Sequence, residues 1–475
     1  WYGDGARKGE EIRTYIMTPE DMEMVIESVP SYDIVNSPLK EAQGWDEAPE
    51  GAKEFVLLTS GGVTRRPALV LKNAQGIYDR VAIYRSKKSQ QPLAVLKVGE
   101  MVTGIVDDIN QEGELKPACR SMKVVELASD GSRVRMWISN ALDIYNDTLW
   151  QPKALLEKVR TAVGPVPPVS LIGGEDAELV GEIFEPSWAL YDQWQADCLR
   201  FLIEHEKYQV VFSHLHNVDC LGHSFWALAK EGNHPGTDTK KFQGYIEQVY
   251  VDTDAYLGEF LHLLDEGWSV IITSDHGLLI KQEEFPAFGD PFGVNAKLMY
   301  DLGYTGLFKD ENGNLTKQID WANTRAIAAR GNHIWINLKG RNEHGIVEPA
   351  DKYALEEQII SDLYNYRDEN GKRLISIVLR NKDAALLGMN GPECGDLIYW
   401  LAEGPNRVHG DSLSTFCGYM DSSVSPIFIA AGAGIKQGYT NRVIRQVDVA
   451  PTAAVLAGVR MPKECEGAVV YQILE

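Results

Sequence analysis

Residues 268–277 read W-S-V-I-I-T-S-D-H-G, an apolar run of strand length followed directly by Asp275 and His276. The apolar periodicity upstream predicts a helix over about residues 241–266, which leads into this strand. A helix, a buried strand and a polar strand end in this order are typical of an α/β sheet, where functional residues gather at the carboxyl ends of the strands. Asp and His are also ligand types for Zn²⁺, so this strand end is a candidate metal site.

The same order occurs once before along the chain. A helix is predicted over about residues 186–207, followed by a short apolar strand at residues 209–214 and then by His216-Asn-Val-Asp-Cys-Leu-Gly-His223. Asp219 and His223 are four residues apart, so both can point at one cation from a loop or a first helical turn. Taken alone such a pair arises often by chance. His216 beside it is predicted to be a loop histidine, and a substrate contact or a residue that orients the ligands are the alternatives.

A third segment supplies His409, in Val408-His409-Gly410-Asp411, ahead of a strand predicted at residues 426–430. Three separated segments with Asp and His near strand ends are what a binuclear hydrolytic site needs, because two adjacent cations hold the attacking and leaving oxygens. The three segments together therefore indicate a binuclear metal site much more strongly than any one of them does.

The composition narrows the class of ligand. The chain has 46 basic and 68 acidic residues and a net charge of −22, so its field repels polyanions and a nucleic acid polymer is not an expected partner. A small anionic substrate would then be attracted by a bound cation. Six cysteines are scattered without a C-x-x-C pair, which predicts reduced thiols and a cytoplasmic protein. Apolar runs are too short to span a membrane, so no membrane association is expected.

Several further motifs follow one another in a recognisable order. They are Asp219-x-x-Gly-His223, Thr273-Ser-Asp-His-Gly277, Trp335-Ile-Asn-Leu-Lys-Gly-Arg341, His409-Gly410, Pro426-Ile-Phe-Ile-Ala-Ala-Gly432 with Gly434-Ile-Lys436, and Val447-Asp-Val-Ala-Pro-Thr452 before Glu466-Gly467. Over about residues 186–475 this order resembles the alkaline phosphatase superfamily, in particular its type I phosphodiesterase and nucleotide pyrophosphatase branch.

The resemblance implies two divalent cations, Zn²⁺ in the first place with Mn²⁺ as the alternative. It implies that Asp219, His223 and His409 hold one cation and that Asp275 and His276 hold part of the other. It also implies an α/β fold with a mostly parallel central sheet flanked by helices. In such proteins a further Asp on an N-terminal strand completes the second site, and a Thr or Ser after it is the nucleophile.

That N-terminal block is not found in this sequence. Thr59 and Ser60 are the nearest hydroxyl pair, but they lie in a β-rich segment and read better as turn residues. We therefore expect the nucleophile on an N-terminal fragment or companion chain that completes the site, with a homo-oligomer also open. The expected organisation is a connecting segment at residues 1–50, an inserted β-rich, cap-like domain at 51–145, and at 146–475 an alkaline phosphatase-like domain lacking its N-terminal strands.

The predicted activity is hydrolysis of a phosphoric ester by in-line displacement at phosphorus, with a phosphodiester or nucleotide pyrophosphate as the preferred substrate class. Two alternatives stay open at this point. One is a phosphomutase or sulfatase of the same superfamily, which shares most of the metal ligands. The other is a non-catalytic, metal-binding structural subunit.

Overall fold

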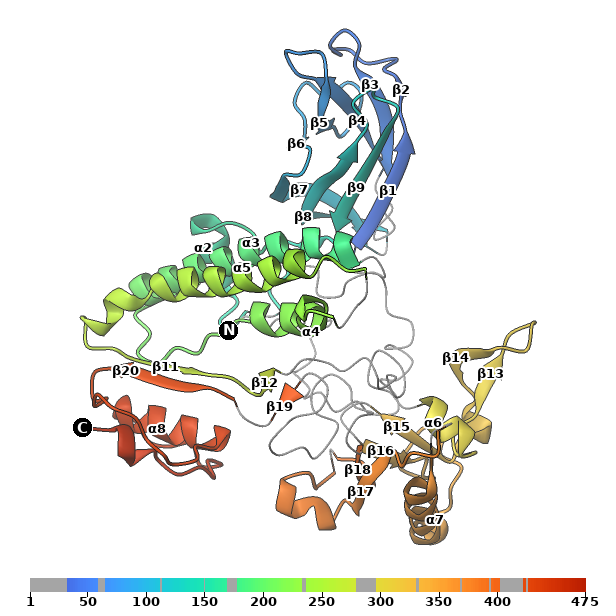
Figure 1. Cartoon of the computed structure of the whole chain (residues 1–475), viewed down its shortest axis with the longest axis vertical. Coiled ribbons are helices and arrows are strands. Elements are labelled where there is room, and N and C mark those ends of the chain that lie inside the picture. Colours follow the sequence, from blue (N-terminus) through green and yellow to red (C-terminus); the bar gives the residue numbers. More distant parts are fainter. Residues whose placement is uncertain are drawn as a thin grey trace.

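The computed structural model describes residues 32–58, 65–111, 113–148, 150–168, 177–232, 236–278, 296–329, 333–367, 370–392, 394–401, 422–423 and 426–475. Figure 1 shows a β-rich unit, a layer of helices below it, and two smaller groups of elements nearer the C-terminus. No helix within the described ranges is long and apolar enough to cross a membrane.

The β-rich unit consists of two five-stranded antiparallel sheets. The first sheet has the order β2 (Lys40–Glu41), β3 (Lys53–Leu58), β4 (Arg65–Lys72), β5 (Tyr78–Ile83) and β6 (Ala94–Lys97). The second has β1 (Tyr32–Pro38), β9 (Arg133–Ser139), β8 (Glu114–Leu127) and β10 (Leu142–Asp143), with β7 (Met101–Gln111) paired to β8.

One core joins these two sheets. Phe55 and Val81 of the first sheet are buried in the same cluster as Met122 and Met136 of the second. Alternate residues along each strand face this cluster, which is the period of two that a half-buried sheet requires. Strand β1 pairs with β9 along its whole length although it falls in the predicted connecting segment. The predicted domain boundaries otherwise stay predictions.

Four helices follow, namely α2 (Ala154–Ala162), α3 (Ala177–Glu206), α4 (Asn217–Ala229) and α5 (Thr239–Gly258). Helices α3, α4 and α5 share a cluster in which Trp188, Phe225 and Phe242 are almost completely buried. The predicted helix over 241–266 ends earlier, at Gly258, and the chain continues as the short 3-10 helix η2 (Leu261–Leu264). Glycine has a low helix propensity, which favours an end at that residue.

The strand predicted at residues 209–214 is not formed. These residues take an irregular path, and the side chains of Val210 and Phe212 are exposed. A strand is stable only when its backbone groups pair with a neighbour, and none of the strands in the described ranges pairs with this segment. The prediction from apolar content was therefore wrong for this part of the structure.

The strand predicted directly before Asp275 is formed as β11 (Ser269–Thr273), and it pairs antiparallel with β20 (Phe428–Gly432). A two-residue strand, β12 (Gly277–Leu278), then pairs with β19 (Ser422–Ser423). In Figure 1 the helices α3 to α5 lie on one side of the β11–β20 ribbon and α8 (Val449–Leu456) lies on the other.

The remaining unit is a four-stranded antiparallel sheet packed against helices α6 (Ala296–Asp301) and α7 (Lys352–Asn365). Its order is β15 (Ala326–Ala329), β16 (His333–Ile336), β18 (Leu397–Leu401) and β17 (Ile375–Arg380). A hairpin of β13 (Leu307–Lys309) and β14 (Leu315–Ile319) extends from it. Short 3-10 helices are η3 (Trp321–Asn323), η4 (Pro349–Asp351), η5 (Asp383–Leu387), η6 (Gln446–Asp448) and η7 (Tyr471–Ile473).

The fold is thus mixed α/β, and the sequence prediction of this fold class is confirmed. Within the described ranges every pairing between named strands is antiparallel, and parallel pairing occurs only as two isolated bridges. The mostly parallel central sheet expected from the sequence is not seen in this part of the chain.

Candidate metal centre

The start of α4 carries the first half of the candidate site. His216 is the N-cap residue of this helix and Asp219 lies in its first turn. Asn217 between them is fully buried, and its side-chain amide donates to Thr253 Oγ1 of α5 at 2.9 Å. This bond ties the start of α4 to its neighbour, so the backbone that presents Asp219 has a fixed position.

The end of β11 carries the second half. Thr273 Oγ1 donates to the carbonyl of Ile427 at 3.2 Å, and the Ile427 N–H donates to Ser274 Oγ at 3.1 Å. Gln446 Nε2 also donates to the Ser274 carbonyl, at 3.4 Å. Three bonds from a distant part of the chain therefore hold the bend that presents Asp275 and His276. The sequence did not indicate a role for Gln446, because its contact is with the backbone carbonyl of Ser274 and no local pattern marks such a contact.

Gly222 allows these two halves to approach. A Cβ atom at this glycine would lie 2.2 Å from Leu278 Cδ1, well inside the contact distance of two carbon atoms. Leu278 belongs to β12, two residues beyond His276. The glycine of the Asp-x-x-Gly-His motif thus has a packing role, because it lets α4 lie directly against the strand end.

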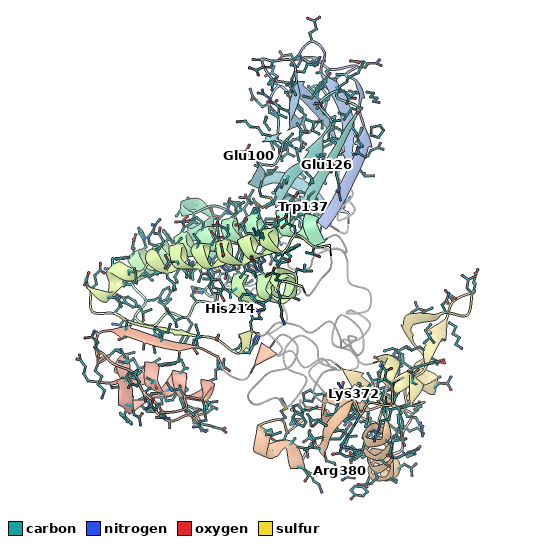
Figure 2. All side chains as sticks on the ribbon, in the orientation of Figure 1. Glu100, Glu126, Trp137, His214, Lys372 and Arg380 are labelled. Carbon is teal, nitrogen blue, oxygen red and sulfur yellow. The ribbon has the colours of Figure 1, made fainter. Side chains whose placement is uncertain are left out.

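The side chains of His216 and His276 meet at the carboxylate of Asp219. Figure 2 labels His214, whose ring packs against that of His216. His276 Nε2 lies 3.2 Å from Asp219 Oδ1, and His216 Nε2 lies 2.9 Å from Asp219 Oδ2. Asp275 Oδ2 lies 3.9 Å from His276 Nε2. The contact with Asp219 raises the pKa of His276, against the opposite effect of partial burial.

The ring orientation of His276 is defined by a second bond. Its Nδ1 lies 3.1 Å from the carbonyl oxygen of Gly277. Since a carbonyl can only accept, Nδ1 carries a proton, and Nε2 is the ring nitrogen that a cation would take once the imidazole is neutral. This arrangement, in which one ring nitrogen is tied to a backbone carbonyl, is common for histidines that bind metals.

The donor set fits a divalent cation of the zinc or manganese type. It combines carboxylate oxygens with imidazole nitrogens, and the side chains of Asp219, His276 and His216 are all less than one quarter exposed. The Sγ atom of Cys220 also lies within 4.8 Å of ligand atoms of His216 and Asp219. A partly buried carboxylate between two imidazoles is a site in which a cation would compensate the negative charge.

The structure therefore brings together Asp219, Asp275, His276 and His216 from two distant motifs. His223 lies in α4 one helical turn after Asp219, and its side chain is outside the described part. His409 lies outside the described residues, as do Thr59 and Ser60. The assignment of the five metal ligands stays a prediction.

The basic side chains of the motif at residues 335–341, which could bind an anionic substrate, form ion pairs with acidic residues. Arg341 forms a bidentate pair with Asp396, with both N–O distances at 2.7 Å, and Lys339 pairs with Glu348. His333 is buried in β16, accepts from the Gly395 N–H at 2.9 Å, and its pKa is lowered by burial to about 4. These residues stabilise the four-stranded sheet unit.

The Val447-Asp-Val-Ala-Pro-Thr452 motif is also structural. Asp448 is fully buried and accepts from the Arg442 and Arg445 guanidinium groups at 3.0 and 2.9 Å, and from the Ala468 N–H at 2.9 Å. Burial opposes ionisation, but the bond from the Ala468 N–H and the backbone and side chain of Arg445 lower the pKa of Asp448 to about 2. A Cβ atom at Gly467 would lie 1.7 Å from the Val447 carbonyl oxygen, so only glycine fits beside this motif.

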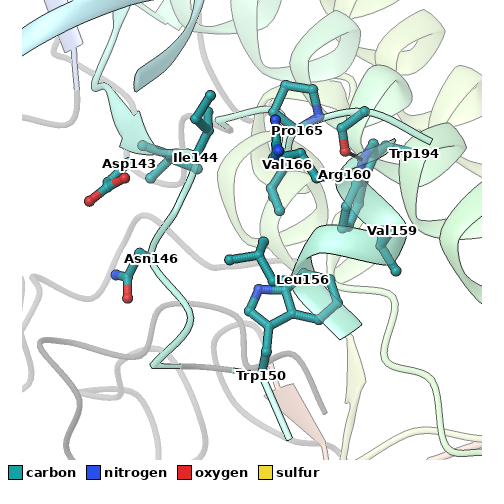
Figure 3. A pocket seen from close by; sticks show the side chains of 12 residues that line it. Asp143, Ile144, Asn146, Trp150, Leu156, Val159, Arg160, Pro165, Val166 and Trp194 are labelled. Carbon is teal, nitrogen blue, oxygen red and sulfur yellow. Dashed lines mark hydrogen bonds between the residues drawn. The ribbon is translucent and has the colours of Figure 1, made fainter. Parts of the chain in front are cut away.

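A pocket of about 90 Å³ lies between the end of β10 and helices α2 and α3 (Figure 3). Trp150, Trp194, Val159 and Pro165 give it apolar walls, and Asn146 lies at its side. None of the candidate metal ligands lines it. We therefore do not assign the substrate to it.

Comparison with known proteins identifies the protein family to which the chain belongs. The sequence profile of the type I phosphodiesterase / nucleotide pyrophosphatase family matches residues 135–412, which is more than half of the sequence. The chain belongs to this family, within the alkaline phosphatase superfamily. The match includes Asp219, Asp275, His276 and His409.

Two solved structures are similar to the chain. One is the wild-type alkaline phosphatase PafA, with 17% identity and a TM-score of 0.41 over 60% of this chain and 53% of that one. The other is a quadruple mutant of PafA, with 18% identity and a TM-score of 0.40 over 65% of this chain and 57% of that one. The chain thus spans little more than half the length of either. A search of curated proteins gives no match.

Proposed function

We propose that this protein is a metal-dependent phosphoric ester hydrolase that acts by in-line displacement at phosphorus on a binuclear metal site, with phosphodiesters or nucleotide pyrophosphates as substrates. Membership of a phosphoester hydrolase family supports the reaction class. A mostly parallel central sheet, with β11 as one of its strands, and two bound cations, Zn²⁺ or Mn²⁺, belong to the same proposal.

One observation carries the proposal. His276 Nε2 lies 3.2 Å from Asp219 Oδ1, although the two residues come from different motifs on different elements. In the proposed ligand sets, Asp219 serves one cation with His223 and His409, and His276 serves the other with Asp275. A contact between one ligand of each set is what two neighbouring cation sites require.

The residues of the chain would divide the work as follows. Asp219, Asp275 and His276 bind and orient the cations, and the bonds that Ile427 and Gln446 donate to Ser274 keep the strand end rigid. When bound, the cations supply Lewis-acid stabilisation of the charge that develops on the phosphoryl oxygens. The attacking hydroxyl is a Thr or Ser that the proposal does not place on a described residue.

The test is hydrolysis of bis(p-nitrophenyl) phosphate by the full chain with added Zn²⁺ or Mn²⁺, compared with p-nitrophenyl phosphate and p-nitrophenyl sulfate. With the companion segment that supplies the nucleophile present, we expect the diester to be the best substrate and EDTA to abolish turnover. Asp219→Asn should lower the rate at least about 100-fold, because it removes a metal-binding carboxylate. Asp265→Asn, on an exposed residue after η2, is the matched control and should leave the rate unchanged.

The other outcomes identify the alternatives. Preferential hydrolysis of the sulfate ester would replace the proposal with a sulfatase. Bound zinc without turnover of any of the three esters would favour a non-catalytic metal-binding subunit.

A further inference from the structure

We infer that His216 is a positioning residue, which holds the Asp219 carboxylate so that one defined oxygen faces the metal site. This inference rests on the proposed metal site and adds a residue that the ligand set does not include. The contact that suggests it is the 2.9 Å distance between His216 Nε2 and Asp219 Oδ2.

The contact divides the two oxygens of Asp219 between different partners. Oδ2 faces His216, whereas Oδ1 faces His276 on the side of the strand end. A carboxylate that is free to rotate would present either oxygen to a cation. An N–H donor on Oδ2 removes that freedom, and hydrogen bonds of this kind to ligating carboxylates are a regular feature of metal sites.

The His216 ring is itself held in place. Trp188 of α3 meets it edge to face, with 5.9 Å between the ring centroids, and His214 packs on it with 5.0 Å between centroids. Trp188 is almost completely buried in the core between α3, α4 and α5. The orientation of His216 is thus set by the helical layer, and through His216 that layer sets the orientation of Asp219.

Two other roles for His216 have to be distinguished from positioning. A merely local role would be to cap α4, but the His216 side chain makes no capping bond to the helix. A direct metal ligand is the second role, since ligand atoms of His216, Asp219 and Cys220 lie within 4.8 Å of one another. Nε2 cannot donate a proton to Asp219 and a lone pair to a cation at the same time, so the two roles exclude each other.

A pair of substitutions separates these roles. His216→Ala removes the donor, whereas His216→Gln replaces Nε2–H with an amide N–H at a similar reach but gives a poor ligand for Zn²⁺. The measurement is the zinc affinity of the full chain, obtained by competition with a chromophoric chelator. Thermal unfolding of the metal-free proteins reports the structural effect separately.

The positioning role predicts that His216→Ala weakens zinc binding by about 10–100-fold, and that His216→Gln restores most of the affinity. His205→Gln, at an exposed histidine of α3, is the matched control and should bind zinc like the wild type. Equal weakening by the Gln and Ala variants, or wild-type affinity in His216→Ala, would overturn the inference. Absence of zinc binding in the wild type would instead refute the proposed metal site, and the inference with it.

Discussion

The His276 imidazole faces the Asp219 carboxylate, with Nε2 3.2 Å from Oδ1. This contact joins the first turn of α4 to the end of β11, and it is where two sequence motifs become one site. Its geometry depends on close packing, because α4 and β12 approach each other at Gly222.

Gly222→Ala should weaken the site through packing alone. The added methyl group would overlap Leu278 Cδ1 at 2.2 Å, so α4 and β12 must separate or Leu278 must move. Overpacking costs about 1–3 kcal/mol, and the higher helix propensity of alanine offsets up to about 1 kcal/mol of it. We expect a net loss of at most about 2 kcal/mol in the free energy of unfolding and weaker zinc binding, measured by denaturant titration and chelator competition.

Two controls make this prediction specific. Gly244→Ala lies in α5 where nothing is within 4 Å of the new methyl group, and it should stabilise the protein by about 0.5–1 kcal/mol. Leu278→Ala combined with Gly222→Ala should recover zinc affinity. Normal zinc affinity in Gly222→Ala alone would show that the close approach does not matter.

Asp192 of α3 should make stability depend on pH. This residue is 2% exposed, and burial together with the nearby charge of Asp252 raises its pKa to about 7. Between its ordinary pKa and about 7, the folded protein holds a proton that the unfolded chain has released. The free energy of unfolding therefore falls as the pH rises through this window.

Asp192→Asn removes the cost of ionising a buried carboxyl group. The variant should be more stable than the wild type at pH 8, by at most about 4 kcal/mol, and the difference should vanish near pH 4. Urea unfolding at several pH values measures it. A variant that is less stable than the wild type at pH 8 would contradict the expected sign.

Asp448 should behave in the opposite way. Its pKa of about 2 is below the ordinary value, so the carboxylate stabilises the fold at neutral pH, and this contribution is lost as the pH falls through the folded-state pKa. Asp448→Ala leaves the Ala468 N–H without its acceptor and removes the shared partner of Arg442 and Arg445, and it should cost about 1–3 kcal/mol.

The measurement is the free energy of unfolding at pH 7, with Asp265→Asn as an exposed control. Because Asp448 anchors the Ala468 backbone, the variant should also lose hydrogen-exchange protection at that amide. Retained protection at Ala468 and an unchanged free energy of unfolding would show that the contacts of Asp448 do not stabilise the fold.

The sequence predicted two of the elements around the site, because their signals are local, but it indicated the start of α4, which carries Asp219, only as a loop or a first helical turn. The apolar run before Asp275 is β11, and the periodic apolar residues beginning with Trp188 form α3. Membership of the phosphodiesterase family was likewise readable from the order of the motifs.

Other features depend on distant partners and left no local signal. Val210 and Phe212 have strand-like composition, but no described strand pairs with them, and composition alone does not supply a neighbour. From the sequence, the orienting role of His216 was only one of three open roles, because the contact with Asp219 depends on how Trp188 and His214 hold the ring. Membership of β1 in the β-rich unit is set by its pairing with β9, far along the chain.

The most direct test of the account is the zinc content of the dialysed full chain and of its Asp219→Asn variant, measured by elemental analysis. The site with Asp219, His223 and His409 as ligands predicts about one zinc ion per wild-type chain, about two where a companion segment completes the second site, and a clear loss in the variant. Wild-type protein without bound zinc, or a variant that keeps the full wild-type content, would contradict the claim that Asp219 and His276 meet at a metal centre.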